Sequence, residues 1–266
     1  MQTRREIIRG GLGLAGIIAA GEAPAAVVKS MLSARKEIAA GSGDEPLSAK
    51  SYVQDGLVAM WDGIENAGWG VHDPNATVWK DLVGGIGDLS IDKTKWTECG
   101  VDFDGFALSK DIQPTFSALT IETSVDSFSQ IINGTGIYVG GFVGWPNQSG
   151  TGNVSVGFWG DSIQSSSAYS KSNRLDSNEV PMHNISAVFT SATKTIYNDG
   201  EYKSMNGYGV SQPSGRFSIM GYYSISGNIV YIGKANVRNV RLYSSALTAD
   251  EIAANYAVDK ARFNLP

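Results

Sequence analysis

The segment 235–256, ANVRNVRLYSSALTADEIAANY, constrains the fold most because it places an alternating strand directly before a capped helix. Val237, Val240 and Leu242 are apolar and alternate with polar residues in a nearly period-2 pattern. Such a pattern predicts a strand with one buried face and one solvated face.

The helix that follows has a clear start. Thr248 and Glu251 have the spacing of a capping box, and Leu247 and Ile252 occupy the staple positions on either side of it. The sequence therefore predicts a short helix from about Ala249 to Val258 that closes the domain.

From residue 52 onward, short runs of Val, Ile, Phe, Tyr and Thr are separated by turn signals. These signals are Asp104-Gly105, Asn133-Gly134, Asp199-Gly200 and Asn206-Gly207. The 32 glycines fit a chain with many tight turns. This organisation predicts an all-β sandwich or barrel with one core. Its predicted core residues are Phe103, Ile121, Val188, Ile196, Val240 and Leu242.

The order of these motifs resembles the laminin G-like, concanavalin A-like jelly-roll family. The motifs are DGLVAMW at 55–61, WKDLVGGIGDL at 79–89, VDFDG at 101–105, the hairpin at 184–203, and the step at 219–235 before the last strand. The resemblance implies an antiparallel two-sheet jelly-roll sandwich over residues 52–266 with a short C-terminal helix.

The first 40 residues have a different character. Arg4 and Arg5 precede a Gly/Ala-rich run at 10–21, which resembles a twin-arginine export signal with cleavage near 23–25. This run of about 12 residues is short of the ~20 that span a bilayer, so we expect no stable membrane span. The alternative is an N-terminal helix that attaches the domain to an assembly partner. Residues 41–51 are predicted to be a linker.

Charge and cysteine content exclude several classes. A net charge of −5 and a pI near 5.1 argue against binding to nucleic acid, which requires a concentrated basic surface. Cys99 is the only cysteine, so neither an intramolecular disulfide nor a cysteine metal cluster is possible.

Catalytic motifs are weak. Glycoside hydrolases need two carboxylates across a cleft, but Glu122 and Asp126 are four residues apart, about 13 Å along a strand. Asp102 and Asp104 share a strand face beside a hairpin signal, where solvated side chains are expected. His72 and His183 lie in no zinc or triad motif. The sequence therefore predicts that the protein is not an enzyme.

The sequence leaves a metal site as an open alternative. Laminin G-like relatives often hold one calcium ion, and calcium accepts loop carboxylates without a strict motif. Asp62, Asp73 and Asp81 are the candidate loop ligands.

Aromatic and amide side chains in turn-rich segments are the candidate ligand contacts. These are Trp69, Trp145, Asn147 and Tyr208, each flanked by Gly, Asn, Pro or Gln. A flat ring beside hydrogen-bonding groups is suited to a sugar.

The favoured interpretation is an exported bacterial module, periplasmic, secreted or at the cell surface, that binds a glycan or surface polysaccharide without catalysis. A structural or receptor-binding component of a phage tail, located in the virion, is the alternative, and a divergent glycoside hydrolase is a weaker one.

Overall fold

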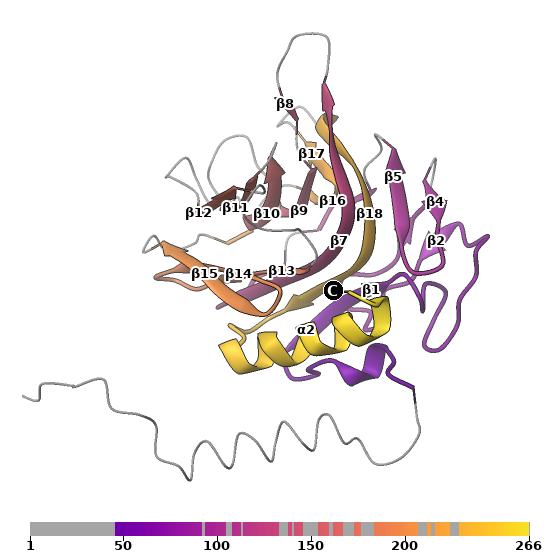
Figure 1. The fold of residues 1–266 in the computed structure, drawn as a ribbon, viewed down its shortest axis with the longest axis horizontal. Coiled ribbons are helices and arrows are strands. Elements are labelled where there is room, and N and C mark those ends of the chain that lie inside the picture. The colour runs from indigo at the N-terminus through magenta and orange to yellow at the C-terminus, as the bar shows by residue number, and fades with distance from the viewer. Residues whose placement is uncertain are drawn as a thin grey trace, which may run out of the picture. The chain divides into compact units, whose positions relative to one another are not determined.

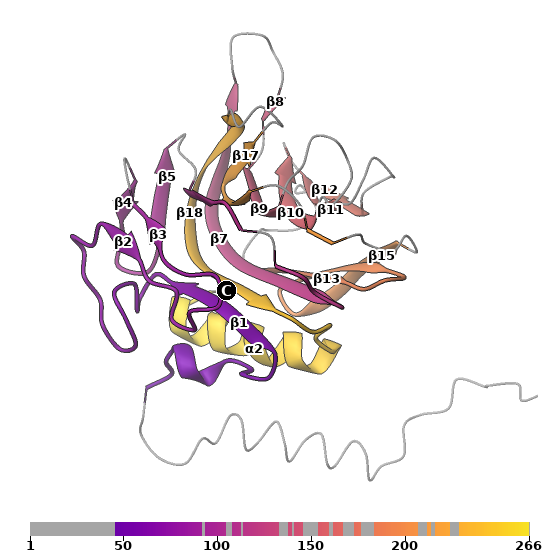
Figure 2. The ribbon, with the colours of Figure 1, turned by 180° about the vertical axis from the view of Figure 1, so that it is seen from behind.

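Two long neighbouring strands, β7 (Leu119–Ile132) and β18 (Ile229–Tyr243), form the centre of the domain and run side by side in Figures 1 and 2. Both are rich in β-branched and aromatic residues, which favour strands. They pair antiparallel from Gly233 opposite Gln130 to Tyr243 opposite Thr120. Two register shifts interrupt this pairing, as β-bulges do where a strand bends.

The computed structural model describes residues 46–91, 94–104, 108–112, 114–132, 138–139, 141–145, 154–159, 162–166, 173–176, 184–206, 212–213, 216–223 and 229–265.

Two sheets and a short ribbon account for the strands in these ranges. The ten-stranded sheet contains, besides β7 and β18, the strands β1 (Leu57–Asp62), β4 (Lys95–Trp96), β5 (Val101–Asp104), β8 (Tyr138–Val139), β13 (Asn184–Phe189), β14 (Lys194–Asn198), β15 (Glu201–Asn206) and β17 (Gly221–Tyr223). The six-stranded sheet contains β6 (Leu108–Lys110), β9 (Gly141–Trp145), β10 (Val154–Trp159), β11 (Ser162–Ser166), β12 (Asn173–Asp176) and β16 (Phe217–Ile219). The ribbon pairs β2 (Val78–Trp79) with β3 (Leu89–Ser90).

The order along the main path of the large sheet is β15-β14-β13-β7-β18-β5-β4, and the small sheet runs β12-β11-β10-β9-β16-β6. Neighbouring strands in the described part of the chain are antiparallel throughout. The predicted all-β sandwich is confirmed.

The hairpin between β14 and β15 shows how the turn signals work. Asp199 and Gly200 have φ of 51° and 75°, the paired left-handed conformation of a two-residue type I′ turn. The carboxylate of Asp199 also accepts the backbone N–H of Asn184 at 3.0 Å, which joins the turn to β13. The Asp-Gly prediction at this position is therefore confirmed.

The apolar core lies between the two sheets. The six predicted core residues are all buried; five lie in this core, and Val188, the most accessible at 7%, packs in a separate cluster with Tyr243, Leu247 and Ile252. Phe217 of β16 packs against two tryptophans, and its ring centroid lies 5.1 Å from that of Trp61 and 5.1 Å from that of Trp145. These contacts bring strands of both sheets together.

The other face of the large sheet is buried as well. Helix α2 (Ala249–Phe263) lies along it beside the 3₁₀ helix η1 (Ala49–Ser51) in Figures 1 and 2. Asn239 and Arg241, which the alternating pattern places on a solvated face, are each 0% exposed, and so is Glu122 of the neighbouring strand β7. The half-buried interpretation of β18 is wrong because this helix replaces solvent over the polar face.

The start of α2 agrees with the sequence. Thr248 Oγ1 accepts the N–H of Glu251 at 3.3 Å, and Glu251 Oε2 accepts the N–H of Thr248 at 2.7 Å. Both staple residues are buried. The helix continues past Val258 to Phe263 and ends where Asn264 adopts φ 52°, a left-handed C-cap.

Residues just before the predicted domain boundary contact the domain. Ser48 caps η1 inside the segment expected to be a linker, and Ala49 is 0% exposed. The N–H of Val53 donates to the side chain of Asn255 at 2.8 Å, which joins this segment to α2. The last residues of the expected linker therefore belong to the domain.

Candidate functional site

The connection from β1 to β2, residues 63–77 (the 63–77 loop), is held by the side chain of Glu65, which is 4% exposed. Its Oε2 accepts the N–H of Gly70 at 2.8 Å, and its Oε1 accepts the N–H of Ala49. Arg262 of α2 donates Nη2 to the same Oε1 at 3.1 Å. One buried carboxylate thus joins the loop, η1 and α2.

Trp69 lies at the tip of a turn formed by residues 68–71 (the Trp69 turn). The N–H of Val71 donates to the carbonyl of Gly68 at 2.9 Å, and Gly68 and Gly70 have φ of 145° and 70°. A Cβ at either glycine would meet no atom within 4 Å, so the flanks of the tip are open. Trp69 is 38% exposed. The turn therefore presents an aromatic ring to solvent on a positioned backbone.

Further bonds order the loop behind this turn. The side-chain amide of Asn66 donates to the carbonyl of Asp73 at 2.8 Å and accepts its N–H at 2.8 Å. Nδ1 of the exposed His72 lies 3.1 Å from the carbonyl of Ile64. Because these bonds cross the loop, the Trp69 turn needs little ordering before it meets a partner.

Two features border the exposed ring. Lys50 of η1 has its Nζ 5.5 Å from the Trp69 ring centroid. Val71, at the other end of the turn, is 51% exposed. The surface around the indole therefore combines an apolar patch with a cation.

Asp62, an expected calcium ligand, is bound by protein donors instead. Its Oδ1 accepts the N–H groups of Ile64 and Glu65, and both oxygens accept the guanidinium of Arg262. Burial raises the pKa of this carboxyl, and Arg262 opposes that shift. The acceptor positions of Asp62 therefore serve the loop and the helix.

Asp81, the second expected ligand, also accepts protein donors. Its Oδ1 accepts the N–H groups of Met60 and Val83, and its Oδ2 accepts those of Ile86 and Gly87. Four backbone donors leave it a turn-organising side chain.

Asp73 is the third expected ligand, and its Oδ1 accepts the N–H of Asn75 at 2.8 Å. Within the described ranges, no three His, Cys, Asp or Glu side chains come together in an arrangement that could hold a metal ion.

Trp145 is also corrected. It is the last residue of strand β9 and does not lie in a loop, and it is 0% exposed. Its Nε1 donates to the carbonyl of Ile112 at 2.7 Å, so the one polar atom of the ring is satisfied inside the protein. Val143 and Trp145 are two residues apart on this strand, so both side chains point into the core. The glycines and the proline around them suggested a loop instead.

The expected contacts are therefore not assembled into one site. Trp145 packs among Phe116 and Phe217, whereas Trp69 contacts Lys50. Asn147, Tyr208 and His183 lie outside the described residues. Of the expected ligand contacts within those residues, only Trp69 has an exposed ring.

The carboxylates beneath α2 form a closed network. Arg241 donates Nη1 and Nη2 to the two oxygens of Asp259, each at 2.8 Å, and Nε to Glu122 at 3.0 Å. Asn255 donates to Glu122 at 2.7 Å, and Asn184 donates to Asp259. These side chains are each 0% exposed, so a substrate does not reach them.

The pKa values of the two carboxyls in this network are shifted in opposite directions. Burial raises the pKa of Glu122 above its usual range, although Arg241 opposes the shift. Burial also acts to raise the pKa of Asp259, but the charge and hydrogen bonds of Arg241, with bonds from Tyr52 and Asn239, hold it below its usual range. Asp259 is therefore the carboxylate that Arg241 keeps ionised.

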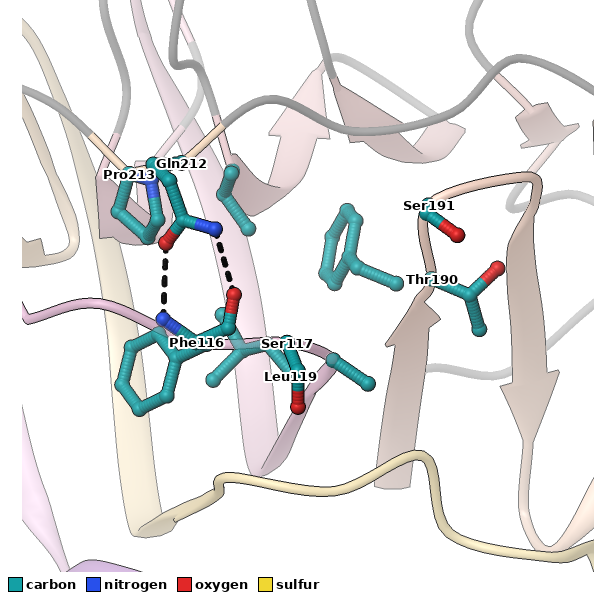
Figure 3. Close-up of a pocket in the computed structure, with 10 residues that line it drawn as sticks. Phe116, Ser117, Leu119, Thr190, Ser191, Gln212 and Pro213 are labelled. Atoms are coloured by element: carbon teal, nitrogen blue, oxygen red, sulfur yellow. Dashed lines mark hydrogen bonds between the residues drawn. The ribbon is translucent and has the colours of Figure 1, made fainter.

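A small pocket lies among the first residues of β7 and β10 and the last residue of β13 (Figure 3). Its volume is ≈ 110 Å³. Gln212 forms one wall, where its Oε1 accepts the N–H of Phe116 at 2.8 Å and its Nε2 donates to the Phe116 carbonyl at 2.6 Å. Figure 3 shows the turn residues Thr190 and Ser191 on the opposite wall.

Sequence reasoning missed both Glu65 and this pocket. The spacing Asp62-x-x-Glu65 was the available signal for the loop, because Asp62 accepts the Glu65 N–H at 2.9 Å as a capping residue does. The pocket has no local signal, since segments far apart in the chain line it.

Comparisons with known proteins give the fold alone. No family model matches this chain, and no curated protein matches it. It is similar to a Trypanosoma rangeli sialidase in complex with 2,3-difluorosialic acid, with a TM-score of 0.51 and 16% identity over 87% of this chain and 38% of that one. The botulinum neurotoxin serotype D binding domain matches with a TM-score of 0.49 and 13% identity over 76% of this chain and 52% of that one. The chain thus spans well under half of the sialidase.

Among the helices that the structure describes, none is long and apolar enough to cross a membrane.

Proposed function

We propose that this protein is a non-catalytic module that binds a glycan or surface polysaccharide through the Trp69 turn. The observation that carries the proposal is an exposed indole whose supporting backbone is bonded to the buried carboxylate of Glu65. A sugar ring offers an apolar face of C–H groups, and a rigid aromatic side chain offers a matching flat surface. Backbone order in advance of binding lowers the entropy cost of the complex.

The absence of catalysis is part of the proposal. Glycoside hydrolysis uses two carboxylates that face a sugar across a cleft. The buried carboxylates Glu122 and Asp259 face Arg241 beneath α2, and Asp62 faces Arg262. On β5, Asp102 accepts a hydrogen bond from Asn236 at 2.8 Å, as a surface residue of a sheet does. These pairings support a binding role.

The test is a panel of immobilised polysaccharides and glycans, assayed with calcium and with a chelator. Trp69→Ala should weaken Kd by about tenfold or more, as expected for a central aromatic contact. Tyr202→Ala is the matched control, because Tyr202 is an aromatic residue on β15 that is 58% exposed. Both variants should keep the wild-type melting temperature.

Unchanged binding in Trp69→Ala would remove the Trp69 turn from the proposal. Release of reducing sugar from any member of the panel would replace the binding module with a glycoside hydrolase.

We further propose that the domain is a laminin G-like module exported through the twin-arginine route. The ordered motifs between residues 55 and 256 support the family, and Arg4 and Arg5 before an apolar run support export. Replacing Arg4 and Arg5 together by lysine should leave a full-length precursor in the cytoplasm, because lysine keeps the charge and loses the guanidinium. Unchanged export of this double variant would contradict the twin-arginine signal.

A further inference from the structure

The small pocket of Figure 3 is a separate cavity with a distinct chemistry. Leu119, Val154 and Phe189 line it and are 1–3% exposed, so its floor is apolar. Ser117 and Ser191 line it as well and are exposed, so polar residues border its mouth. A group that fits must therefore carry an apolar end and a polar end.

The charge of the lining residues limits which chemical groups can bind in the pocket. None of the described residues that line the pocket is charged. A charged group placed there would lose its hydration without gaining a partner of opposite charge, which is costly. Gln212 does not compensate, because its amide oxygen and its amide nitrogen both bond to the backbone of Phe116. The occupant is therefore an uncharged group.

The volume of the pocket limits the size of the group that can bind there. An apolar cavity of about 150 Å³ holds benzene, which has six non-hydrogen atoms, so ≈ 110 Å³ has room for a group of roughly four. An acetamido group has this size. It carries a methyl end and a planar amide that donates and accepts one hydrogen bond each.

We propose that this pocket binds the acetamido group of an N-acetylated sugar. The methyl group packs on Leu119, Val154 and Phe189, and the amide meets the hydroxyls of Ser117 and Ser191 at the mouth. The inference rests on the proposed glycan-binding function for the source of the group, but it uses a cavity that the Trp69 turn does not line.

The test is saturation-transfer NMR on the full chain with three monosaccharide probes. N-acetylglucosamine should receive saturation chiefly at its acetyl methyl protons. Glucose, which lacks the acetamido group, and glucosamine, which is charged, should receive much less. Equal transfer to the three sugars would overturn the proposal.

Two variants on one turn locate the contact. Ser191→Trp covers the mouth and should abolish transfer to the acetyl methyl. Ala192→Trp is the matched control, because Ala192 is exposed beside it and does not line the pocket, and it should retain the signal. Ala118→Leu, which fills the pocket from its edge, should act as Ser191→Trp does, and the melting temperature of each variant checks folding.

Trp69→Ala separates this inference from the proposed function. Transfer to the acetyl methyl should persist in this variant, even if polysaccharide binding is lost. Loss of the methyl signal in Trp69→Ala with retention in Ser191→Trp would place the acetamido group at the Trp69 turn and overturn the pocket assignment.

Discussion

The two faces of the ten-stranded sheet are both buried, but by different chemistry, because the face under α2 combines apolar clusters with buried charged side chains. Against the six-stranded sheet, Ile121, Val240 and Leu242 make an apolar core. Against α2, Glu122 and Arg241 of the same strands pair with each other and, through Arg241, with Asp259 of the helix. Alternation along one strand therefore separates two interiors, and not an interior from solvent.

The difference shows how each layer is specified. Apolar contacts tolerate many packings of similar volume, whereas a buried guanidinium requires acceptors at defined positions. Arg241 bonds to both oxygens of Asp259, which defines the register of α2 on the sheet. The Arg241–Asp259 pair and the apolar contacts of Ile252 therefore both position α2 on the sheet.

The largest expected effect comes from removing the charge beneath α2. Arg241→Met should lower the free energy of unfolding by about 3–5 kcal/mol, because two buried carboxylates lose their counter-ion. Arg238→Met is the control: it removes a pair with Asp126, whose side chain is 46% exposed, and should cost about 1 kcal/mol or less. Urea unfolding measures both. Equal costs in the two variants would contradict a special role for the buried pair.

Leu242 tests the apolar face next to Arg241. Leu242→Ala should cost about 2–4 kcal/mol, since it leaves a cavity between the sheets. Because Leu242 belongs to a cluster of buried apolar residues, the cost should be the same at neutral and acidic pH. A cost that varies with pH would mean that the two faces are coupled.

The two carboxyls of the polar face should respond to acid in opposite ways. The pKa of Asp259 is lowered from 3.8, so its contribution is present above that value and is lost as pH falls through the folded pKa. The pKa of Glu122 is raised from 4.5, so its contribution is present below that value and is lost as pH rises through the folded pKa.

Substituting each carboxyl by its amide separates the two contributions to stability. The deficit of Glu122→Gln relative to wild type should grow as pH falls from neutral toward 4.5, whereas the deficit of Asp259→Asn should shrink below 3.8. Urea unfolding at a series of pH values measures both. Parallel curves for the two variants would show that the carboxyls titrate alike.

The sequence predicted the apolar face and the helix start because both have short-range signals. Leu242 follows a period of two, and Thr248 with Glu251 follows a spacing of three. The polar face was misinterpreted because Glu122 and Asp259 are 137 positions apart, and a polar residue on a strand carries no mark of the helix that covers it.

The candidate site divides in the same way. Trp69 was predicted as a loop aromatic, and its exposure agrees with a loop position. Trp145 has the same kinds of neighbours in sequence, yet the strand alternation that starts at Val143 buries it. The residues next to a tryptophan in the sequence can indicate a turn. Whether its side chain points into the core depends on the alternation of the strand that precedes it.

The smallest expected effect concerns the cap of α2. Thr248→Ala should cost about 1 kcal/mol, because it removes the acceptor of the Glu251 N–H at an exposed helix end far in sequence from Arg262. Since Arg262 holds Glu65 from the last turn of the helix, loss of the first-turn cap should leave the Trp69 turn and its ligand affinity unchanged. Differential scanning calorimetry and glycan binding measure the two properties. A large loss of affinity at wild-type stability would show that the helix start takes part in recognition, and that the polar face acts as one unit from Thr248 to Arg262.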